Sequence, residues 1–242
     1  MAIELPGPVA DFLGFIGISW PRVNEDKVRE FGEHVAQFAA ELRATHEGAG
    51  GTIQQLGRAY EGEGYEQLLA AWGRMSSEHM DELLTACDVV STAMGIAADV
   101  VVGMKLEAIG ELVVLAAQFI AAQAAAVATF GLAEASLILI ETEGRQIVRF
   151  LEQELVNYVE GKVLDAAVGP LIAVVERAVE GMVYKGVAAA LGVPAGGGGA
   201  GTAVRIEPEA VLSHAASLRE QGTRAESAGQ RFVSVAGSVS FE

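Results

Sequence analysis

Residues 60–72 read Tyr60-Glu61-Gly62-Glu63-Gly64-Tyr65-Glu66-Gln67-Leu68-Leu69-Ala70-Ala71-Trp72, and this stretch decides the fold. Gly62 and Gly64 interrupt a helical pattern that continues on both sides, and glycine is the residue that most readily permits a turn. Apolar side chains before and after these glycines recur at spacings of three and four residues, as they do on one face of a helix. The stretch therefore predicts a turn between two long antiparallel helices.

The two helices that flank this turn should each be roughly 50 Å long or longer, at 1.5 Å per residue. The first is predicted from its N-cap, Asn24, to about Gly57, with fraying or a kink at the glycines of residues 48–52. The second is predicted to begin near Tyr65. Its apolar stripe consists of Tyr65, Leu68, Trp72, Met75, His79, Leu83, Val90, Met94, Ala97, Val101 and Met104. Because two narrow stripes cannot seal each other completely, we expect further helices or a partner to cover them.

Residues 112–133 contain no charged side chain, and a run of this length is long enough to span a membrane. The run is mostly alanine, however, and includes Gln118 and Gln123, so its tendency to insert is weak. We expect a buried helix in which both glutamines find hydrogen-bond partners. The alternative is a membrane-inserting channel or translocation module built on residues 112–140.

The remaining pattern predicts an amphipathic helix over residues 138–159, a break at Gly169-Pro170 and a further helix over residues 171–191. Residues 195–204 are predicted to be a Gly-rich linker. A last helix opens at residues 207–209, and it either docks back on the first domain or forms the first arm of a second hairpin. The predicted fold is an all-α bundle, with a helical domain over residues 1–194, the linker, and the start of a second helical module over residues 205–242.

Composition and charge limit the classes of partner. The chain has 32 acidic and 16 basic residues, a net charge of −16, so nucleic acid is not expected as a partner. Attraction to anionic lipid is disfavoured for the same reason. The first twenty residues are apolar but lack a basic start and a small-residue cleavage site, which indicates a structured cap ending at Trp20-Pro21 and no Sec signal peptide.

No pattern in the sequence indicates catalysis, a metal site, a bound cofactor or a small-molecule substrate. The four histidines are scattered, and His79 on the second helix is expected to be packed or interfacial. The glycines of residues 61–64 follow no strand and lack the spacing of a phosphate-binding loop. Cys87 is interpreted as a small buried apolar residue. We therefore predict that the chain is not an enzyme.

The turn and the start of the second helix resemble the WXG-type substrates of type VII secretion, in which an aromatic-x-Gly turn precedes a helix carrying a second aromatic residue. Tyr60 stands where that family has Trp. Together with residues 4–7, 20–21, 25–26, 103–105 and 120–125, the stretch is similar to the longer WXG-like domain at the N-termini of actinobacterial polymorphic toxins. That group includes the domain proposed as the channel of the tuberculosis-necrotizing toxin precursor. The segment after residue 205 resembles the opening helix of another small type VII secreted class.

This resemblance implies a domain that pairs with a small WXG-type helical hairpin and the type VII machinery, and that delivers a C-terminal effector out of the cell or to its surface. The residues implied to carry the motif or bind the partner are Trp20, Tyr60, Gly62, Tyr65, Leu68, Trp72 and Met75. The family's export signal, Tyr followed four residues later by Asp or Glu, is missing after Tyr65, Tyr158 and Tyr184. The resemblance therefore implies that a partner, or another part of the protein, supplies the signal.

Overall fold

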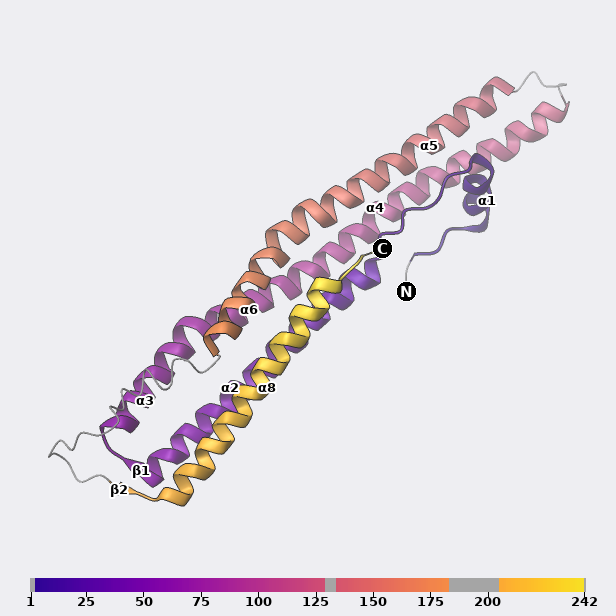
Figure 1. Cartoon of the computed structure of the whole chain (residues 1–242). Helices are drawn as coiled ribbons and strands as arrows, with labels where there is room; N and C mark the ends of the chain where they lie inside the picture. Colours follow the sequence, from indigo (N-terminus) through magenta and orange to yellow (C-terminus); the bar gives the residue numbers. More distant parts are fainter. Residues whose placement is uncertain (1–2, 129–133, 183–204, 242) are drawn as a thin grey trace. The chain divides into compact units, whose positions relative to one another are not determined.

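The computed structural model describes residues 3–128, 134–182 and 205–241, and its fold is all-α, as predicted (Figure 1). The only β-structure in these residues is one antiparallel pair of two-residue strands, in which Tyr60 is paired with Ile206. The elements in chain order are α1 (Gly7–Ile16), α2 (Glu25–Ala59), β1 (Tyr60–Glu61), α3 (Glu63–Arg74), the π-helix η1 (Met75–Met80), α4 (Asp81–Ala128), α5 (Glu134–Val156), the π-helix η2 (Asn157–Val168), α6 (Gly169–Met182), β2 (Arg205–Ile206) and α8 (Pro208–Ser238).

The chain forms two compact units. The first comprises the described residues among 1–30, 93–167 and 240–242, and the second comprises those among 31–92 and 168–239. This grouping differs from the predicted division into residues 1–194 and 205–242, because α8 belongs to the same unit as most of α2. The predicted linker, residues 195–204, lies outside the described residues.

The predicted N-terminal cap is a short helix, α1, in the core of the first unit. Pro6 precedes the helix, and Gly17 ends it in the left-handed conformation, with φ at 68°. The apolar face of α1 packs on α4 and α5, as the Phe12 and Phe119 ring centroids, 5.2 Å apart, show. A Cβ atom on Gly144 of α5 would lie 2.8 Å from the Phe12 ring, so glycine permits this close packing. The core consists of Val9, Phe12, Leu13, Ile16, Leu112, Leu115, Ala116, Phe119, Ile140 and Val148.

A buried ion pair fixes the start of α2. Asn24 caps the helix as predicted, since its Oδ1 accepts from the backbone N–H groups of Asp26 and Lys27. The next residue, Glu25, is 1% exposed, and its Oε2 accepts from Lys105 Nζ at 2.5 Å. Lys105 also donates to the Val23 carbonyl oxygen, and the second Glu25 oxygen accepts from the backbone N–H of Ile3. Two pieces of sequence singled out by the family resemblance, residues 25–26 and 103–105, thus meet in one buried contact.

We predict that Lys105→Met lowers the free energy of unfolding by about 3–5 kcal/mol, because the Glu25 carboxylate would stay buried without its counter-charge. Urea denaturation measures the change. The double variant Lys105→Met/Glu25→Gln should recover part of the loss, and Lys162→Met, on an exposed side chain, should have little effect. A Lys105→Met protein as stable as the parent would contradict a stabilising role for the pair.

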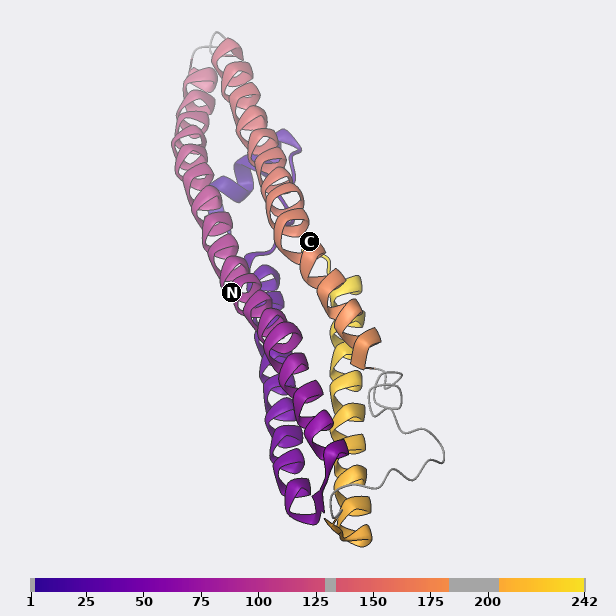
Figure 2. The same ribbon diagram turned by 90° about the vertical axis from the view of Figure 1, so that its left-hand side faces the viewer.

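In the second unit, α8 runs antiparallel along α2 (Figure 2). The Phe232 ring stacks on Phe38, with centroids 4.6 Å apart, and also faces Phe31 at 6.4 Å. Next to β1 and β2, the Glu207 N–H donates to the Ala59 carbonyl oxygen. Arg231 pairs with Glu41 at 2.7 Å. Two alternatives were predicted for the last helix, and the structure shows the first of them, in which the helix docks back on the chain.

We predict that Phe232→Ala lowers the free energy of unfolding by about 3 kcal/mol, because this ring is the largest buried side chain that α8 contributes to the contact with α2. Limited proteolysis should then cut within α8, which stays intact in the parent protein. Leu212→Ala is the matched control, since Leu212 is 71% exposed on the same helix. Equal protease resistance of the Phe232→Ala and Leu212→Ala proteins would show that α8 is held by other contacts.

The long helices depart from expectation in two places. The first helix passes through residues 48–52 without a break and extends to Ala59, so the expected kink is wrong. The second helix begins at Glu63 and changes to a π-helix over η1 before continuing as α4. A π-helical turn holds extra residues and rotates the following face. His79 is therefore exposed and does not pack within the chain, whereas the stripe from Leu83 to Val101 is buried as predicted.

The alanine-rich run is amphipathic and not buried on all sides. Leu112, Leu115 and Phe119 face the core, but Gln118 and Gln123 are exposed, so the expected buried glutamine contacts are wrong. No helix within the described residues is long and apolar enough to cross a membrane. Residues 129–133 of this run lie outside the described residues.

The expected helix break at Gly169-Pro170 is also absent, because η2 leads directly into α6. Pro170 lies in the first turn of α6, after the change from π-helical to α-helical hydrogen bonding. Proline has no backbone N–H to donate to an earlier carbonyl oxygen, so the helix continues across this position with one hydrogen bond fewer.

Candidate partner-binding surface

Two tyrosines at the turn between the long helices lie close to glycines: Tyr60 beside Gly64, and Tyr65 beside Gly57. Gly62 has a φ of 157° and a ψ of 170°, a conformation that glycine adopts far more easily than other residues. After it, the Tyr65 hydroxyl donates to the Ile53 carbonyl oxygen at 3.2 Å. The Tyr65 ring lies where a side chain on Gly57 would clash with it. This contact fixes the start of α3 against the end of α2.

Trp72 lies about two helical turns after Tyr65 on α3 and stacks on His46 of α2. The two ring centroids are 4.5 Å apart, and the planes are inclined by only 13°. A Cβ on Gly50 would be 3.6 Å from Trp72 Nε1, so α2 and α3 come close at this point. Ser76 donates to the Trp72 carbonyl oxygen at 2.8 Å, at the change from α3 to η1.

Six of the seven motif residues gather at this end of the second unit, and none of the six is fully buried. Tyr60, Gly62, Tyr65, Leu68, Trp72 and Met75 are all half-buried. Leu69, beside them on α3, is 40% exposed, and sequence reasoning did not single it out. The helix α3 has no buried side chain at all. The turn and α3 therefore present an apolar surface, which we call the α3 surface.

Trp20, the seventh motif residue, belongs to the first unit. Its ring is half-buried against the core built by α1, α4 and α5. Its indole Nε1 is buried and has no hydrogen-bond partner among the described residues. Trp20 therefore belongs to the N-terminal cap in the first unit, whereas the other six motif residues belong to the second unit.

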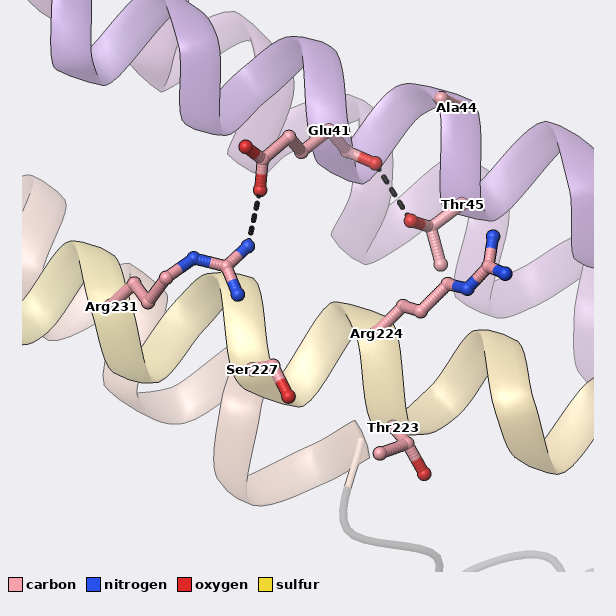
Figure 3. Close-up of a pocket in the computed structure, with 7 residues that line it drawn as sticks. All are labelled: Glu41, Ala44, Thr45, Thr223, Arg224, Ser227 and Arg231. Atoms are coloured by element: carbon pink, nitrogen blue, oxygen red, sulfur yellow. Dashed lines mark hydrogen bonds and ion pairs between the residues drawn. The ribbon is translucent and has the colours of Figure 1, made fainter.

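A hollow of about 450 Å³, lined mainly by polar and charged residues, lies between α2 and α8 (Figure 3). Each of its arginines already has a carboxylate partner: Arg231 pairs with Glu41 at 2.7 Å, and Arg224 pairs with Glu220 at 2.6 Å. Both arginines are well exposed, and such surface pairs contribute at most about 1 kcal/mol. The hollow was not foreseen, because it exists only through the docking of α8. Its lining consists of Glu41, Ala44, Thr45, Thr223, Arg224, Ser227 and Arg231.

Burial is the main cause of the pKa shifts of Cys87 and His46. Burial raises the pKa of the Cys87 thiol to about 12, with a smaller contribution from Asp88, so the sulfur stays protonated. Cys87 is fully buried, as predicted. Among the described residues, no three His, Cys, Asp or Glu side chains are grouped closely enough to hold a metal ion. The absence of catalysis stays a prediction.

The His46–Trp72 stack should make stability depend on pH. Burial disfavours the charged imidazole and lowers the pKa of His46 below its ordinary value of 6.5, although Asp81 and Glu47 act in the opposite direction. The unfolded chain then binds the proton more readily, so the stabilising contribution of His46 is lost as the pH falls through 6.5.

We predict that the urea concentration at the midpoint of unfolding decreases as the pH is lowered from about 7.5 to 5.5. His46→Phe should reduce this decrease, because phenylalanine keeps an aromatic ring but cannot bind a proton. His214→Phe, on α8, is the control for a histidine outside the stack. The same pH dependence in the parent and His46→Phe proteins would contradict the assignment.

Residues 4–145 match the family model described as "WXG100 like domain". The match begins before α1, includes the turn, the α3 surface and all of α4, and ends within α5. It covers more than half of the chain, while η2, α6 and α8 lie beyond it. No curated protein and no solved structure matches the chain.

Proposed function

We propose, because this chain belongs to the WXG100-like domain family, that it is a non-catalytic module that pairs with a small WXG-type helical hairpin and is exported with it. Membership of this family indicates that the chain is a helical protein related to type VII secretion. Pairing with a particular partner, and the role of each motif residue, are our proposal.

The α3 surface is the observation that carries the proposal. The stripe along α2 and α4, which we expected to serve both as core and as partner surface, is largely buried within the chain: Phe31, Phe38, Leu83, Met94 and Val101 are all at most 4% exposed. The motif residues on α3 behave differently, because Leu68, Trp72 and Met75 keep part of their apolar surface exposed. A partner helix that covered α3 would remove this surface from water.

The finer part of the proposal follows the resemblance to the N-terminal domains of actinobacterial polymorphic toxins. In this interpretation the chain carries a C-terminal effector to the type VII machinery and performs no chemistry itself. Export would follow a route that needs no Sec signal peptide, and the Tyr-x-x-x-acid signal would come from the partner or from another part of the protein. The proposal would be overturned by any enzymatic turnover that a single His or carboxylate substitution abolishes.

Co-expression with the small WXG-type proteins encoded by neighbouring genes tests the pairing. We predict that one of them co-elutes with the chain, and that Leu69→Glu weakens the complex at least about tenfold, because a carboxylate would be desolvated in an apolar contact. Leu212→Glu is the matched control, since it introduces the same charge on an exposed leucine of α8.

Two results would contradict the proposal. One is the failure of every neighbouring WXG-type protein to co-elute with a folded chain. The other is an equal effect of Leu69→Glu and Leu212→Glu on the complex, which would place the partner away from α3.

A further inference from the structure

The helix α8 carries a row of residues at alternating spacings of three and four, which is the spacing of the contact positions in a coiled coil. Each residue of this row is buried or half-buried. The row, which we call the α8 row, consists of Val211, His214, Leu218, Gln221, Ala225, Ala228, Phe232 and Val235. It extends over about three and a half heptads, so α8 has the pattern of a helix that pairs lengthwise with another helix.

Half of the positions in the α8 row are polar or small. His214 and Gln221 interrupt the apolar positions, and a polar residue at a contact position lowers the stability of a helix pair. Ala225 and Ala228 remove little apolar surface from water. Phe232 is the one aromatic member of the row. The row therefore predicts a weak helix pair.

The contact between α8 and α2 is correspondingly uneven. The residues of α8 that are buried all belong to its second half, residues 225–232, and residues 208–224 contribute none. Besides the hollow of about 450 Å³, a second one of about 170 Å³ lies between the two helices beside Phe38 and Phe232. Glu41 and Arg231 line both hollows. The face of α2 is thus covered by a helix that does not fill the contact.

The helix α8 is held on α2 partly because it belongs to the same chain. At its start, Tyr60 pairs with Ile206 in the two short strands, and the Glu207 N–H donates to the Ala59 carbonyl oxygen. Such a tether acts like a local concentration on the order of millimolar. A helix that would bind poorly from solution therefore occupies α2 in the free chain.

The covered face and its cover have different standing in the family match. The matched residues, 4–145, include all of α2 but end before α8. The face of α2 thus belongs to the family domain, whereas the helix that covers it does not. Two independent observations, the weak contact and the limits of the match, indicate that α8 stands in for another helix.

We propose that α8 is an exchangeable cover, which a helix of another protein displaces from α2. The chemistry of that helix follows from the contacts of α8. It runs antiparallel to α2, places an aromatic ring between Phe31 and Phe38, and carries a basic residue directly before this ring to pair with Glu41. It differs from α8 in having large apolar residues where α8 has His214 and Gln221. The proposal concerns α2 and does not depend on a partner at the α3 surface.

A synthetic peptide of residues 205–241 with His214→Leu and Gln221→Leu, which we call the leucine peptide, tests the exchange on the full chain. An unaltered peptide has to compete with the identical tethered helix, so its apparent dissociation constant should be on the order of millimolar. Each leucine should strengthen the contact about tenfold. We predict that fluorescence anisotropy gives the leucine peptide an apparent dissociation constant on the order of tens of micromolar.

The matched control is the leucine peptide with Phe232→Ala in addition, which keeps both leucines but lacks the aromatic ring. It should bind at least about tenfold more weakly, because the space between Phe31 and Phe38 stays empty. Equal binding of the two peptides would overturn the proposal, since it would place the leucine peptide away from this face.

Two variants of the full chain test whether α8 has to leave. In Gly48→Cys/Gln221→Cys, a disulfide locks α8 on α2, because a Cβ atom on Gly48 would lie 3.1 Å from the Gln221 amide nitrogen. The native Cys87 is fully buried and does not compete. The oxidised chain should not bind the leucine peptide, and reduction should restore binding. A chain that itself carries His214→Leu/Gln221→Leu should bind the peptide at least about tenfold more weakly than the parent, because its own cover is tighter.

The outcome of these measurements decides the proposal without any natural partner. A parent chain that binds no leucine peptide at about 0.2 mM would overturn it, because the tethered helix would then not be exchangeable. Equal binding to the parent and to the oxidised Gly48→Cys/Gln221→Cys chain would also overturn it. Failure of every small WXG-type protein to bind the α3 surface would leave these results unchanged.

Discussion

A charged ammonium in an apolar core must have acceptors, and the way Lys105 meets this requirement organises the first unit. Its Nζ donates one hydrogen bond to Glu25 Oε2 and one to the Val23 carbonyl oxygen. These bonds fix the first turn of α2, and the segment before it, against α4. Burial alone would raise the pKa of Glu25, but the hydrogen bonds from Lys105 and the Ile3 N–H outweigh it and hold the pKa below its usual range. The carboxylate therefore stays ionised, and the ion pair holds the start of α2 on α4 in the same unit in which α1 packs.

The second unit solves a different problem, which is how to cover the apolar stripe of α2 with few large side chains. Phe232 does most of this by entering between Phe31 and Phe38, while Ala225, Ala228 and Gly229 let α8 approach closely. The chain thus supplies, from its own last helix, the cover that we expected from further helices or from a partner. Apolar side chains that stay exposed lie on several elements, among them Leu69 on α3, Ile120 on α4 and Phe150 on α5.

Periodicity in the sequence predicted the all-α class, the N-cap at Asn24, the turn at Gly62 and the buried stripe from Leu83 to Val101. It could not predict η1 and η2, since a π-helical turn arises from tertiary packing and leaves the spacing of apolar residues nearly unchanged over short windows. For that reason His79, which we expected to be packed or interfacial, is exposed and not packed within the chain. The motif residues were found by resemblance, but the Glu25–Lys105 pair and the docking of α8 depend on contacts between residues far apart in the chain.

The antiparallel course of α8 along α2 also determines how the protein would respond to mechanical pulling. A force on the carboxyl end would first load the hydrogen bond from the Asn24 N–H to the Phe241 carbonyl oxygen, then the Phe232 stack and the Arg231 ion pair. These contacts lie one after another along the chain, so they would break in sequence at low force and not all at once. A machine that draws the chain by this end could therefore peel α8 away while leaving the buried Lys105 contact intact.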